Sequence, residues 1–251
     1  MEYWYKYRND LWKCVKILDH NSGQIRFSEE ENEDKLKSNI RRAARTIEGY
    51  ALCNDWDWFG TFTLNPVYHD RSDLDKFRDD FMMFIRNQRR SYGHIAAILV
   101  PELHKNKQGW HMHGLIQGLP LEALRLFEVT QKLPSYILGK LRDGKAVYDW
   151  PAYRIRFGWV DIEPIKNRDA AARYITKYLT KSVDYTAKAI DLGKHLYYVT
   201  RGLNQPERIE FNNDSDDSSE SLPSGLVKGK GYDFGYGIVQ WYILPNGKDS
   251  N

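Results

Sequence analysis

The sequence predicts an α+β fold in which helices pack on an antiparallel sheet. Three observations support this class. Trp58 to Leu64 alternates apolar and polar residues with the period of a strand. Two further apolar runs flank the turn-forming segment Lys105 to Gly109, which predicts a β-hairpin. Leu74 to Arg90 and Asp169 to Val183 instead repeat apolar residues with helical spacing.

The composition excludes several protein classes. No run of eighteen apolar residues occurs and no signal peptide opens the chain, so we expect a soluble cytoplasmic protein without a membrane partner. The 251 residues include only two cysteines, Cys14 and Cys53. Two cysteines cannot build a disulfide framework or a zinc knuckle, and we expect both thiols to be reduced and structural.

The basic charge is concentrated in the main part of the chain. From Pro206 to Asn251 there are eight acidic and four basic residues, a net charge of −4. Because the whole chain carries +3, residues 1–205 carry +7, which suits an anionic partner. The 17 Tyr, 8 Trp and 10 Phe residues permit base stacking but also suit an ordinary core.

The N-terminal part has less diagnostic patterns. Residues 1–27 are rich in aromatic side chains and are expected to form strands or irregular structure. An acidic run then opens a helix over Asp34 to Tyr50, which groups Arg41, Arg42 and Arg45. An arginine cluster of this kind is either a solvated helix face or a contact for a nucleic-acid backbone.

The first strand of the main domain has one polar face. Trp58 to Leu64 is expected to end at a proline, with Thr61, Thr63 and Asn65 on one face and apolar side chains on the other. The polar row marks a half-exposed strand or the lining of a DNA site. The amphipathic helix Leu74 to Arg90 is expected to pack on the sheet.

The predicted hairpin carries a candidate metal site. His111 and His113 are two residues apart on a strand, so they share a face with their Cβ atoms roughly 6–7 Å apart. Centring the turn on Lys105 to Gly109 places Glu102 across from His111. Two imidazoles and one carboxylate leave several coordination positions open, which suits Mg²⁺ or Mn²⁺ better than a closed zinc site. A surface or core histidine pair is the alternative.

Helices are expected over Leu121 to Thr130 and Pro134 to Arg142. Gly139 to Ala146 has the spacing of a phosphate-binding loop, but Ala146 replaces the Mg²⁺-binding hydroxyl and no strong strand precedes it, so we interpret it as a turn.

Tyr153 to Phe157 is interpreted as a strand with Arg154 and Arg156 on one face, suited to tracking a single strand of nucleic acid. An ordinary exposed strand is the alternative.

Further strands are expected over Gly158 to Ile165, Tyr197 to Thr200 and Phe234 to Leu244. Asn212 to Ser224 is acidic and serine-rich, which predicts a flexible linker.

The helix predicted over Asp169 to Val183 has two distinct faces. Tyr174, Lys177, Tyr178 and Lys181 fall within an arc of about 100°. A separate apolar stripe is available for burial: Ala172, Ile175, Leu179 and Val183.

The segment from Lys166 to Lys181 contains five basic residues, among them the candidate DNA contact Arg173, and one acidic residue. A phenol with a normal pKa of about 10 attacks phosphorus when a metal or cation helps to deprotonate it. A metal at Glu102, His111 and His113 would orient the phosphate for in-line attack, and the lysines would stabilise the developing charge.

Together these segments resemble the HUH endonuclease superfamily, and specifically its rolling-circle replication initiator (Rep) proteins of phages and plasmids. Thr61-Phe62-Thr63-Leu64-Asn65 resembles the first motif of that family, and His111-Met112-His113 resembles the second. The segment from Tyr174 to Lys181 is similar to the third motif, a tyrosine followed by lysine three residues later, and it contains the pattern twice. The His pair precedes the tyrosines, as in Rep proteins and single-tyrosine transposases.

The resemblance implies a central five-stranded antiparallel sheet of the RRM or ferredoxin type, with the His pair on a central strand and the tyrosine helix packed against it. It also implies Mg²⁺ or Mn²⁺, and single-stranded or hairpin origin DNA as substrate. The domains expected are an N-terminal extension (1–50), an HUH nuclease domain (51–206) and an acidic linker with a C-terminal strand (207–251).

We therefore expect a site-specific DNA nickase and ligase of a bacterial host's cytoplasm. Tyr174 or Tyr178 would form a 5′-phosphotyrosine link, with a slight preference for Tyr174 as the first nucleophile. A host helicase and DNA polymerase are expected partners. The alternatives are a DNA- or RNA-binding module with a vestigial metal site, a single-strand transposase of the same superfamily and, less favoured, a His-pair oxygenase.

Overall fold

The computed structural model describes residues 2–17, 31–104, 109–181, 195–209, 222–233 and 237–245. The chain divides into two compact units. Residues 32–203 form the central unit, and residues 1–31 together with 204–251 form the terminal unit. The segment expected as an N-terminal extension (1–50) is thus shared between the two units. None of the helices in these ranges is both long and apolar enough to cross a membrane.

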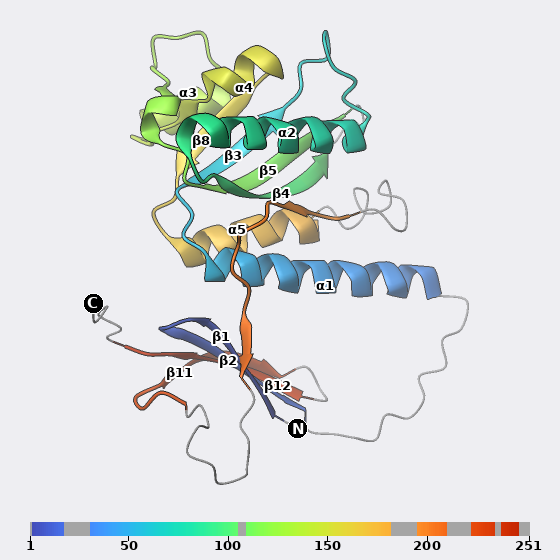
Figure 1. Cartoon of the computed structure of the whole chain (residues 1–251), viewed down its shortest axis with the longest axis vertical. Coiled ribbons are helices and arrows are strands. Elements are labelled where there is room, and N and C mark those ends of the chain that lie inside the picture. Colours follow the sequence, from blue (N-terminus) through green and yellow to red (C-terminus); the bar gives the residue numbers. More distant parts are fainter. Residues whose placement is uncertain are drawn as a thin grey trace. The chain divides into compact units, whose positions relative to one another are not determined.

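The terminal unit contains a five-stranded antiparallel sheet built from both ends of the chain (Figure 1). Its strand order is β10-β1-β2-β12-β11. The strands are β1 (Glu2–Arg8), β2 (Leu11–Ile17), β10 (Glu207–Ile209), β11 (Val227–Asp233) and β12 (Gly237–Ile243). Alternate side chains of these strands bury a small aromatic core around Trp4 and Trp12. Cys14 lies in this core as a free thiol, and its burial raises its pKa to about 12.

The central unit contains a seven-stranded antiparallel sheet, in the order β6-β7-β8-β3-β5-β4-β9. Its long strands are β3 (Trp58–Thr63), β4 (Ala96–Leu103), β5 (Trp110–Gln117) and β8 (Val160–Pro164), and its short ones are β6 (Arg125–Leu126), β7 (Tyr148–Asp149) and β9 (Tyr198–Val199). The helices are α1 (Glu31–Cys53), α2 (Leu74–Tyr92), α3 (Ser135–Arg142), α4 (Pro151–Arg156) and α5 (Arg168–Lys181), with a 3₁₀ turn at Leu121–Ala123. The predicted α+β class with antiparallel sheets is confirmed.

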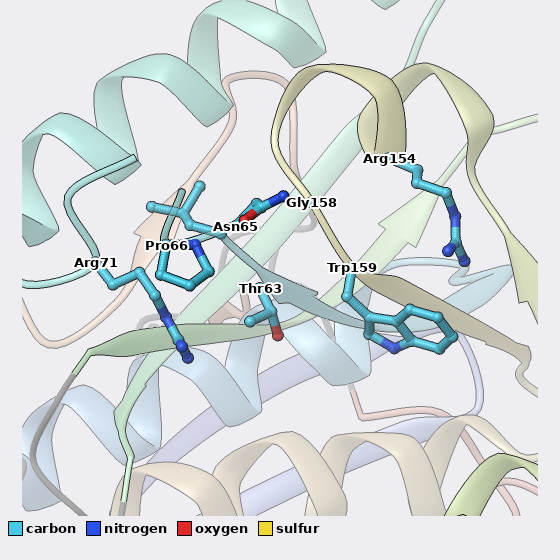
Figure 2. A pocket seen from close by; sticks show the side chains of 8 residues that line it. Thr63, Asn65, Pro66, Arg71, Arg154, Gly158 and Trp159 are labelled. Carbon is cyan, nitrogen blue, oxygen red and sulfur yellow. The ribbon is translucent and has the colours of Figure 1, made fainter. Parts of the chain in front are cut away.

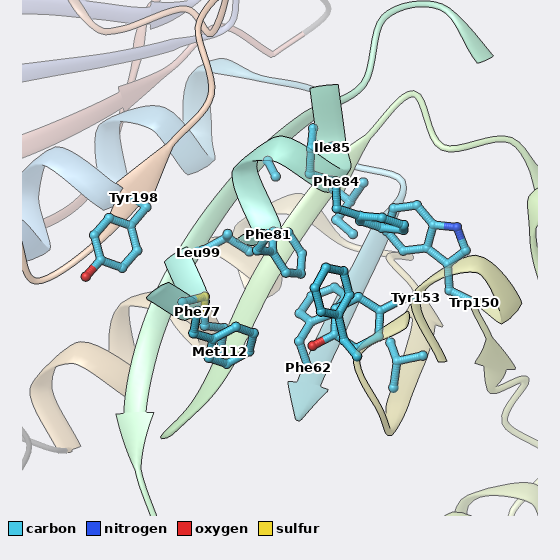
Figure 3. Close-up of a cluster of buried hydrophobic side chains, with 14 of the residues drawn as sticks. Phe62, Phe77, Phe81, Phe84, Ile85, Leu99, Met112, Trp150, Tyr153 and Tyr198 are labelled. Atoms are coloured by element: carbon cyan, nitrogen blue, oxygen red, sulfur yellow. The ribbon is translucent and has the colours of Figure 1, made fainter. Parts of the chain in front are cut away.

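One face of the central sheet is apolar because alternate positions of β3, β4 and β5 carry apolar side chains or glycine, among them Phe62, Leu99 and Met112. The helix α2 covers this face (Figure 1), and its apolar stripe supplies Phe77, Phe81 and Phe84. Phe62 of β3 packs edge-on against Phe81 at a centroid distance of 4.7 Å. Figure 3 shows these rings meeting Tyr153 of α4 in one continuous core. This core fixes which side chains of β3 and β5 must point to the other face.

The opposite face of the sheet is polar along β3 and β5, and α5 contacts β4 and β5 there. The apolar stripe predicted on α5 is confirmed where the side chains are described, since Ala172 and Ile175 are buried. Leu179 and Val183 lie outside the described side chains. The polar face therefore carries the candidate site.

Two predictions of secondary structure were wrong. Tyr153 to Phe157 is not a strand: residues 151–156 form the helix α4, which starts with a proline in its first turn. Tyr153 and Phe157 are four residues apart and both are buried in the core. Helical spacing places residues i and i+4 on the same face, so both side chains can reach the core.

The helix expected over Leu121 to Thr130 is also absent; a 3₁₀ turn and the two-residue strand β6 occupy this described segment. Of its apolar residues Phe127 is buried, but Leu121, Leu126 and Val129 are exposed, so no continuous buried stripe stabilises a helix there.

Candidate functional site

The paired histidines lie on β5, which runs between β3 and β4. Glu102 of β4 is the direct partner of His111, as the hairpin register predicted. On the other side of β5, Thr63 pairs with His111 and Thr61 pairs with His113. Directly opposed residues share a sheet face, so these five side chains gather on the polar face. The turn residues 105–108 lie outside the described ranges.

Neighbouring hydroxyls orient both imidazoles. Oγ1 of Thr63 lies 2.8 Å from Nδ1 of His111, and Oγ1 of Thr61 lies 3.4 Å from Nδ1 of His113. Nε2 of His113 donates to Oε2 of Glu102 over 2.7 Å. The two rings are 6.5 Å apart between centroids. The threonines on β3 thus lie at Nδ1 of each ring, and Glu102 engages Nε2 of His113.

His111 is held in its neutral form. Burial lowers its pKa to about 4, and the nearby charges of His104, His113 and Arg71 act in the same direction, whereas Glu102 opposes them. The ring of His104 packs against that of His111 at 4.3 Å between centroids. A neutral imidazole is the form that binds metal ions, so His111 is ready to act as a ligand at neutral pH.

This pKa shift predicts a pH-dependent contribution to stability. The pKa of His111 is about 4 in the folded chain, below its ordinary value of 6.5, so between these values the unfolded chain binds more protons. The free energy of unfolding should therefore rise with pH across this window, and the stabilisation is lost as the pH falls towards 4. Urea titrations at pH 4.5 and 7 should show this rise reduced by about 2 kcal/mol in His111→Gln. An equal rise in His111→Gln and in the exposed-residue control His195→Gln would contradict it.

The donor set is chemically suited to a hard divalent ion. Two imidazole nitrogens and one carboxylate oxygen are available, and the 2.7 Å between Glu102 and His113 is close to the spacing of adjacent ligands around such an ion. Within the described residues, however, no three His, Cys, Asp or Glu side chains already form a metal site. Binding an ion would require the proton between Glu102 and His113 to leave.

The helix α5 brings one candidate nucleophile close to the histidines. Tyr174 is 46% exposed, and its ring contacts Phe59 of β3 edge-on at 4.9 Å between centroids. Phe59 also has His113 as a neighbour, whose ring is stacked at 6.1 Å. A single side chain therefore touches both candidate groups. The side chains of Tyr178 and Lys181 lie outside the described part of the structure, and Lys177 is exposed on α5.

Tyr174 also borders a basic cavity of about 550 Å³. Three lysines, Lys140, Lys145 and Lys166, line it together with Phe59 and with Glu163, to which Lys140 donates over 2.8 Å. Lys140 and Lys145 come from the segment with phosphate-loop spacing. Here that segment is the end of α3 and a turn in which Gly144 adopts a positive φ of 73°, in agreement with its interpretation as a turn. Its lysines, rather than a helix N-terminus, provide positive charge beside the phenol.

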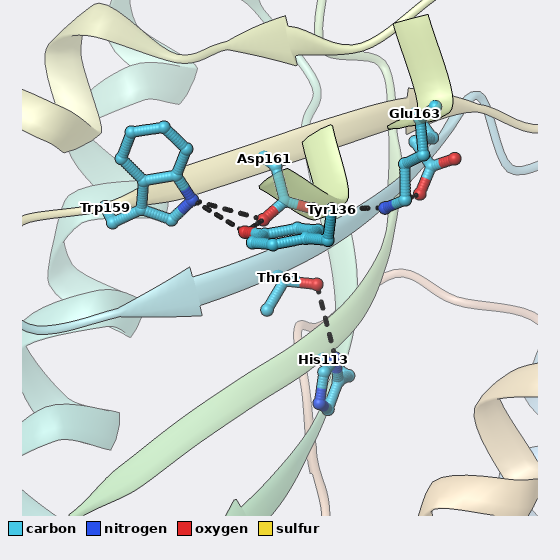
Figure 4. A network of polar contacts seen from close by, with 7 residues as sticks. Thr61, His113, Tyr136, Trp159, Asp161 and Glu163 are labelled. Atoms are coloured by element: carbon cyan, nitrogen blue, oxygen red, sulfur yellow. Dashed lines mark hydrogen bonds and ion pairs between the residues drawn. The ribbon is translucent and has the colours of Figure 1, made fainter. Parts of the chain in front are cut away.

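A buried carboxylate, Asp161, continues the polar row onto β8, where it is the direct partner of Thr61. The hydroxyl of Tyr136 and the indole N–H of Trp159 donate to Oδ1 of Asp161 over 2.8 and 3.3 Å (Figure 4). Lys140 lies 3.7 Å from its other oxygen. Burial raises the pKa of Asp161, and these contacts partly offset the rise. Asp161 thus connects Tyr136 of α3 to β8, which pairs with β3 on the side away from the His strand.

The predicted DNA-contacting residues fall into two groups. Thr63, Asn65 and Arg154 line one cavity (Figure 2), whereas Thr61 lies next to His113. Arg156 lies at the end of α4, where its guanidinium packs over Phe157, and Arg173 is exposed on α5. The structure thus brings the first three together, but Arg156 and Arg173 do not line that cavity.

A family model for the replication-associated protein ORF2 matches residues 57–183. This segment covers just over half of the chain and includes β3, the His strand and α5. The chain belongs to this family of replication-associated proteins. Membership supports a role in replication initiation and the assignment as a Rep-type protein. Searches of curated proteins and of solved structures gave no match.

For this member of the replication-associated protein family, the sequence-based prediction missed several residues at the site. Asp161 has a detectable signal, because Trp159, Asp161 and Glu163 alternate along a predicted strand and so share a face. Phe59 is two residues before Thr61 on β3, so the same alternation places it on the face that carries Thr61. Arg71 lies outside the helices and strands, in a segment without periodicity, so no pattern pointed to it.

Proposed function

We propose that this Rep-family chain nicks and rejoins single-stranded origin DNA through a covalent 5′-phosphotyrosine intermediate. The observation that carries the proposal is the position of Phe59, which contacts both Tyr174 and His113. A phosphate bound on this face next to Phe59 would have the phenol of Tyr174 on one side and the His pair on the other, the arrangement that in-line attack requires. Fold alone does not imply this chemistry; the contacts of Phe59 with Tyr174 and His113 are what supports it.

In the nicking step the phenol oxygen of Tyr174 or Tyr178 attacks the phosphorus. A bond forms between the phenol oxygen and phosphorus, the bond between phosphorus and the 3′ oxygen breaks, and the phenol proton is lost as the released 3′ oxygen gains one. Lys177 and two of the lysines that line the cavity, Lys145 and Lys166, would offset the charge on the phosphate oxygens. Rejoining is the reverse reaction, so the energy of the original bond is conserved.

Glu102, His111 and His113 would hold a divalent ion. When bound, Mg²⁺ or Mn²⁺ would neutralise the phosphate and favour its orientation for in-line attack. Thr61 and Thr63 would fix the rotation of the imidazoles, because each lies near Nδ1 of one ring. His111, neutral at pH 7, needs no deprotonation before it can coordinate.

The hydrogen bond between Glu102 and His113 favours a second candidate, a single-strand binding module without catalysis. This bond satisfies both groups in the absence of an ion. Such a module would use the same basic cavities for a nucleic-acid backbone but would form no covalent bond.

One experiment separates the two candidates. A pool of single-stranded oligonucleotides of random sequence, labelled at the 3′ end, is incubated with the full chain and Mn²⁺, and the products are resolved under denaturing conditions. The nickase is expected to yield a labelled adduct that protease removes and EDTA prevents. Binding to the same pool without any adduct would contradict the nickase and support the binding module.

A further inference from the structure

A cavity of about 380 Å³ is lined by Thr63, whose hydroxyl oxygen lies 2.8 Å from Nδ1 of His111. It is lined by Thr63, Leu64, Asn65, Pro66, Arg71, Arg154, Gly158 and Trp159. We propose that this cavity binds the nucleotide on the 5′ side of the scissile phosphate, the one whose 3′ oxygen leaves, and that Arg71 binds a phosphate of that nucleotide's strand. The direction assigned to the DNA strand rests on the proposed function, whereas the binding site rests on the residues that line the cavity.

The shape and chemistry of the cavity suit an anionic nucleotide. Its volume lies within the range of about 300–1,000 Å³ typical of small-molecule sites. Its eight lining residues include two arginines, a hydroxyl, an amide and an indole, and no carboxylate. Figure 2 shows Arg71 and Arg154 on opposite sides of Thr63 and Trp159. A negatively charged ligand would therefore meet the guanidinium of Arg71 on one side and, on the other, that of Arg154, which is paired with Asp149.

Arg71 is held in place, yet its Nε lacks an acceptor within the described part of the chain. Its carbonyl oxygen accepts a hydrogen bond from the backbone N–H of Trp110 over 2.8 Å, which ties it to the start of the His strand. A Cβ at Gly109 would lie 2.6 Å from Cβ of Arg71, so the two backbones are close. Nε of Arg71 is buried and has no hydrogen-bond partner among the described residues. Leaving a charged donor unpaired costs free energy, and an arriving phosphate oxygen would supply the acceptor after a small side-chain shift.

The remaining walls are rigid. Nε of Arg154 donates to Asp149 over 2.7 Å, and its guanidinium lies 4.4 Å from the ring centre of Trp159. Gly158 has a φ of 141°, and a Cβ there would lie 2.5 Å from the backbone nitrogen of Asn65. Only glycine allows these two chain segments to approach so closely. The cavity is thus preformed, which reduces the entropy lost on binding.

The position of the cavity gives the direction of the DNA strand. Thr63 lines the cavity and contacts His111, whereas Phe59, four residues earlier on β3, lines the cavity that contains Tyr174. The two cavities therefore flank the histidines along β3. In an in-line displacement the leaving oxygen lies opposite the attacking phenol. The nucleotide that leaves with the 3′ hydroxyl consequently belongs on the Arg71 side, and the nucleotide that stays linked to tyrosine belongs on the lysine side.

The first arm of the test does not require cleavage. Fluorescence anisotropy measures the affinity of the full chain for an eight-nucleotide oligo-dT at several salt concentrations. Arg71→Ala is expected to weaken binding about tenfold and to reduce the slope of log K against log salt by about 0.7, as for one lost contact to a single-strand phosphate. Arg71→Lys should recover part of the affinity. The matched control Arg90→Ala removes an exposed arginine from α2, on the opposite face, and should stay within twofold of the parent chain.

The second arm tests direction with the two halves of a cleaved oligonucleotide. Arg71→Ala should weaken binding of the half that ends in a 3′ hydroxyl and leave the half that begins with a 5′ phosphate within twofold. Equal loss for both halves, or loss only for the 5′-phosphate half, overturns the assignment. Equal oligo-dT binding by Arg71→Ala and Arg90→Ala overturns it even if adducts form. If no adduct forms but Arg71→Ala alone weakens oligo-dT binding, the nickase proposal fails while the nucleotide-binding cavity stands.

Discussion

Replacing Tyr174 and Tyr178 together by phenylalanine is expected to abolish the covalent adduct with single-stranded DNA, a loss of more than about a thousandfold. Phenylalanine keeps the aromatic ring, including the contact of residue 174 with Phe59, but removes the oxygen that attacks phosphorus. The fold should therefore persist while the chemistry stops. The measurement is the yield of protease-sensitive adduct with Mn²⁺ and a cleavable oligonucleotide.

The single variants refine this prediction. Because Tyr174 borders the basic cavity and shares Phe59 with His113, Tyr174→Phe should reduce nicking of a fresh substrate far more than Tyr178→Phe does. Tyr92→Phe, at the end of α2, is the matched control, since Tyr92 is also partly exposed but does not line that cavity. Undiminished adduct in the double variant would exclude both tyrosines as nucleophiles.

The second large effect is expected at the metal ligands. Substituting alanine for both His111 and His113 removes two of the three proposed donors, so metal-dependent nicking should fall below detection while the far-UV circular dichroism spectrum stays unchanged. Both side chains lie on the polar face, away from the core that α2 covers, which is why the fold should tolerate the change. Normal nicking by this variant would refute the site.

The third ligand can be assigned by the same assay. Glu102 contacts His113, whereas His104 packs against His111. Glu102→Gln is therefore expected to raise the Mn²⁺ concentration needed for half-maximal nicking by about tenfold to a hundredfold. His104→Ala should have a smaller effect. The opposite order would identify His104 as the ligand in place of Glu102.

The sequence allowed much of this site to be predicted because its geometry is local. A period of two fixes which residues of a strand share a face, so Thr61 and Thr63 could be placed beside each other without a structure. The hairpin register that opposes Glu102 and His111 followed from a short connection. The helix with Tyr174 likewise followed from its apolar stripe.

Features that depend on distant pairing could not be predicted. The terminal sheet joins β2 to β12, more than two hundred residues later in the chain, and β11 is glycine-rich and exposed, so no alternation marks it. Segment 151–156 is too short for helical and strand periods to be distinguished, and only the core contacts of Tyr153 decide between them. The position of Arg71 next to the His strand also depends on such pairing, because its carbonyl oxygen accepts a hydrogen bond from the backbone N–H of Trp110.

The most direct test of the proposed mechanism identifies the residue that carries DNA. Trypsin would release Tyr-Ile-Thr-Lys and Tyr-Leu-Thr-Lys, which have equal masses, from the two candidate positions. Cleavage before aspartate instead gives one peptide, residues 169–183, whose fragmentation spectrum locates the modified tyrosine. The mechanism predicts a nucleotide 5′-phosphate on Tyr174 when fresh substrate is nicked. A modification on neither Tyr174 nor Tyr178, or nucleotide attached through its 3′ end, would contradict it.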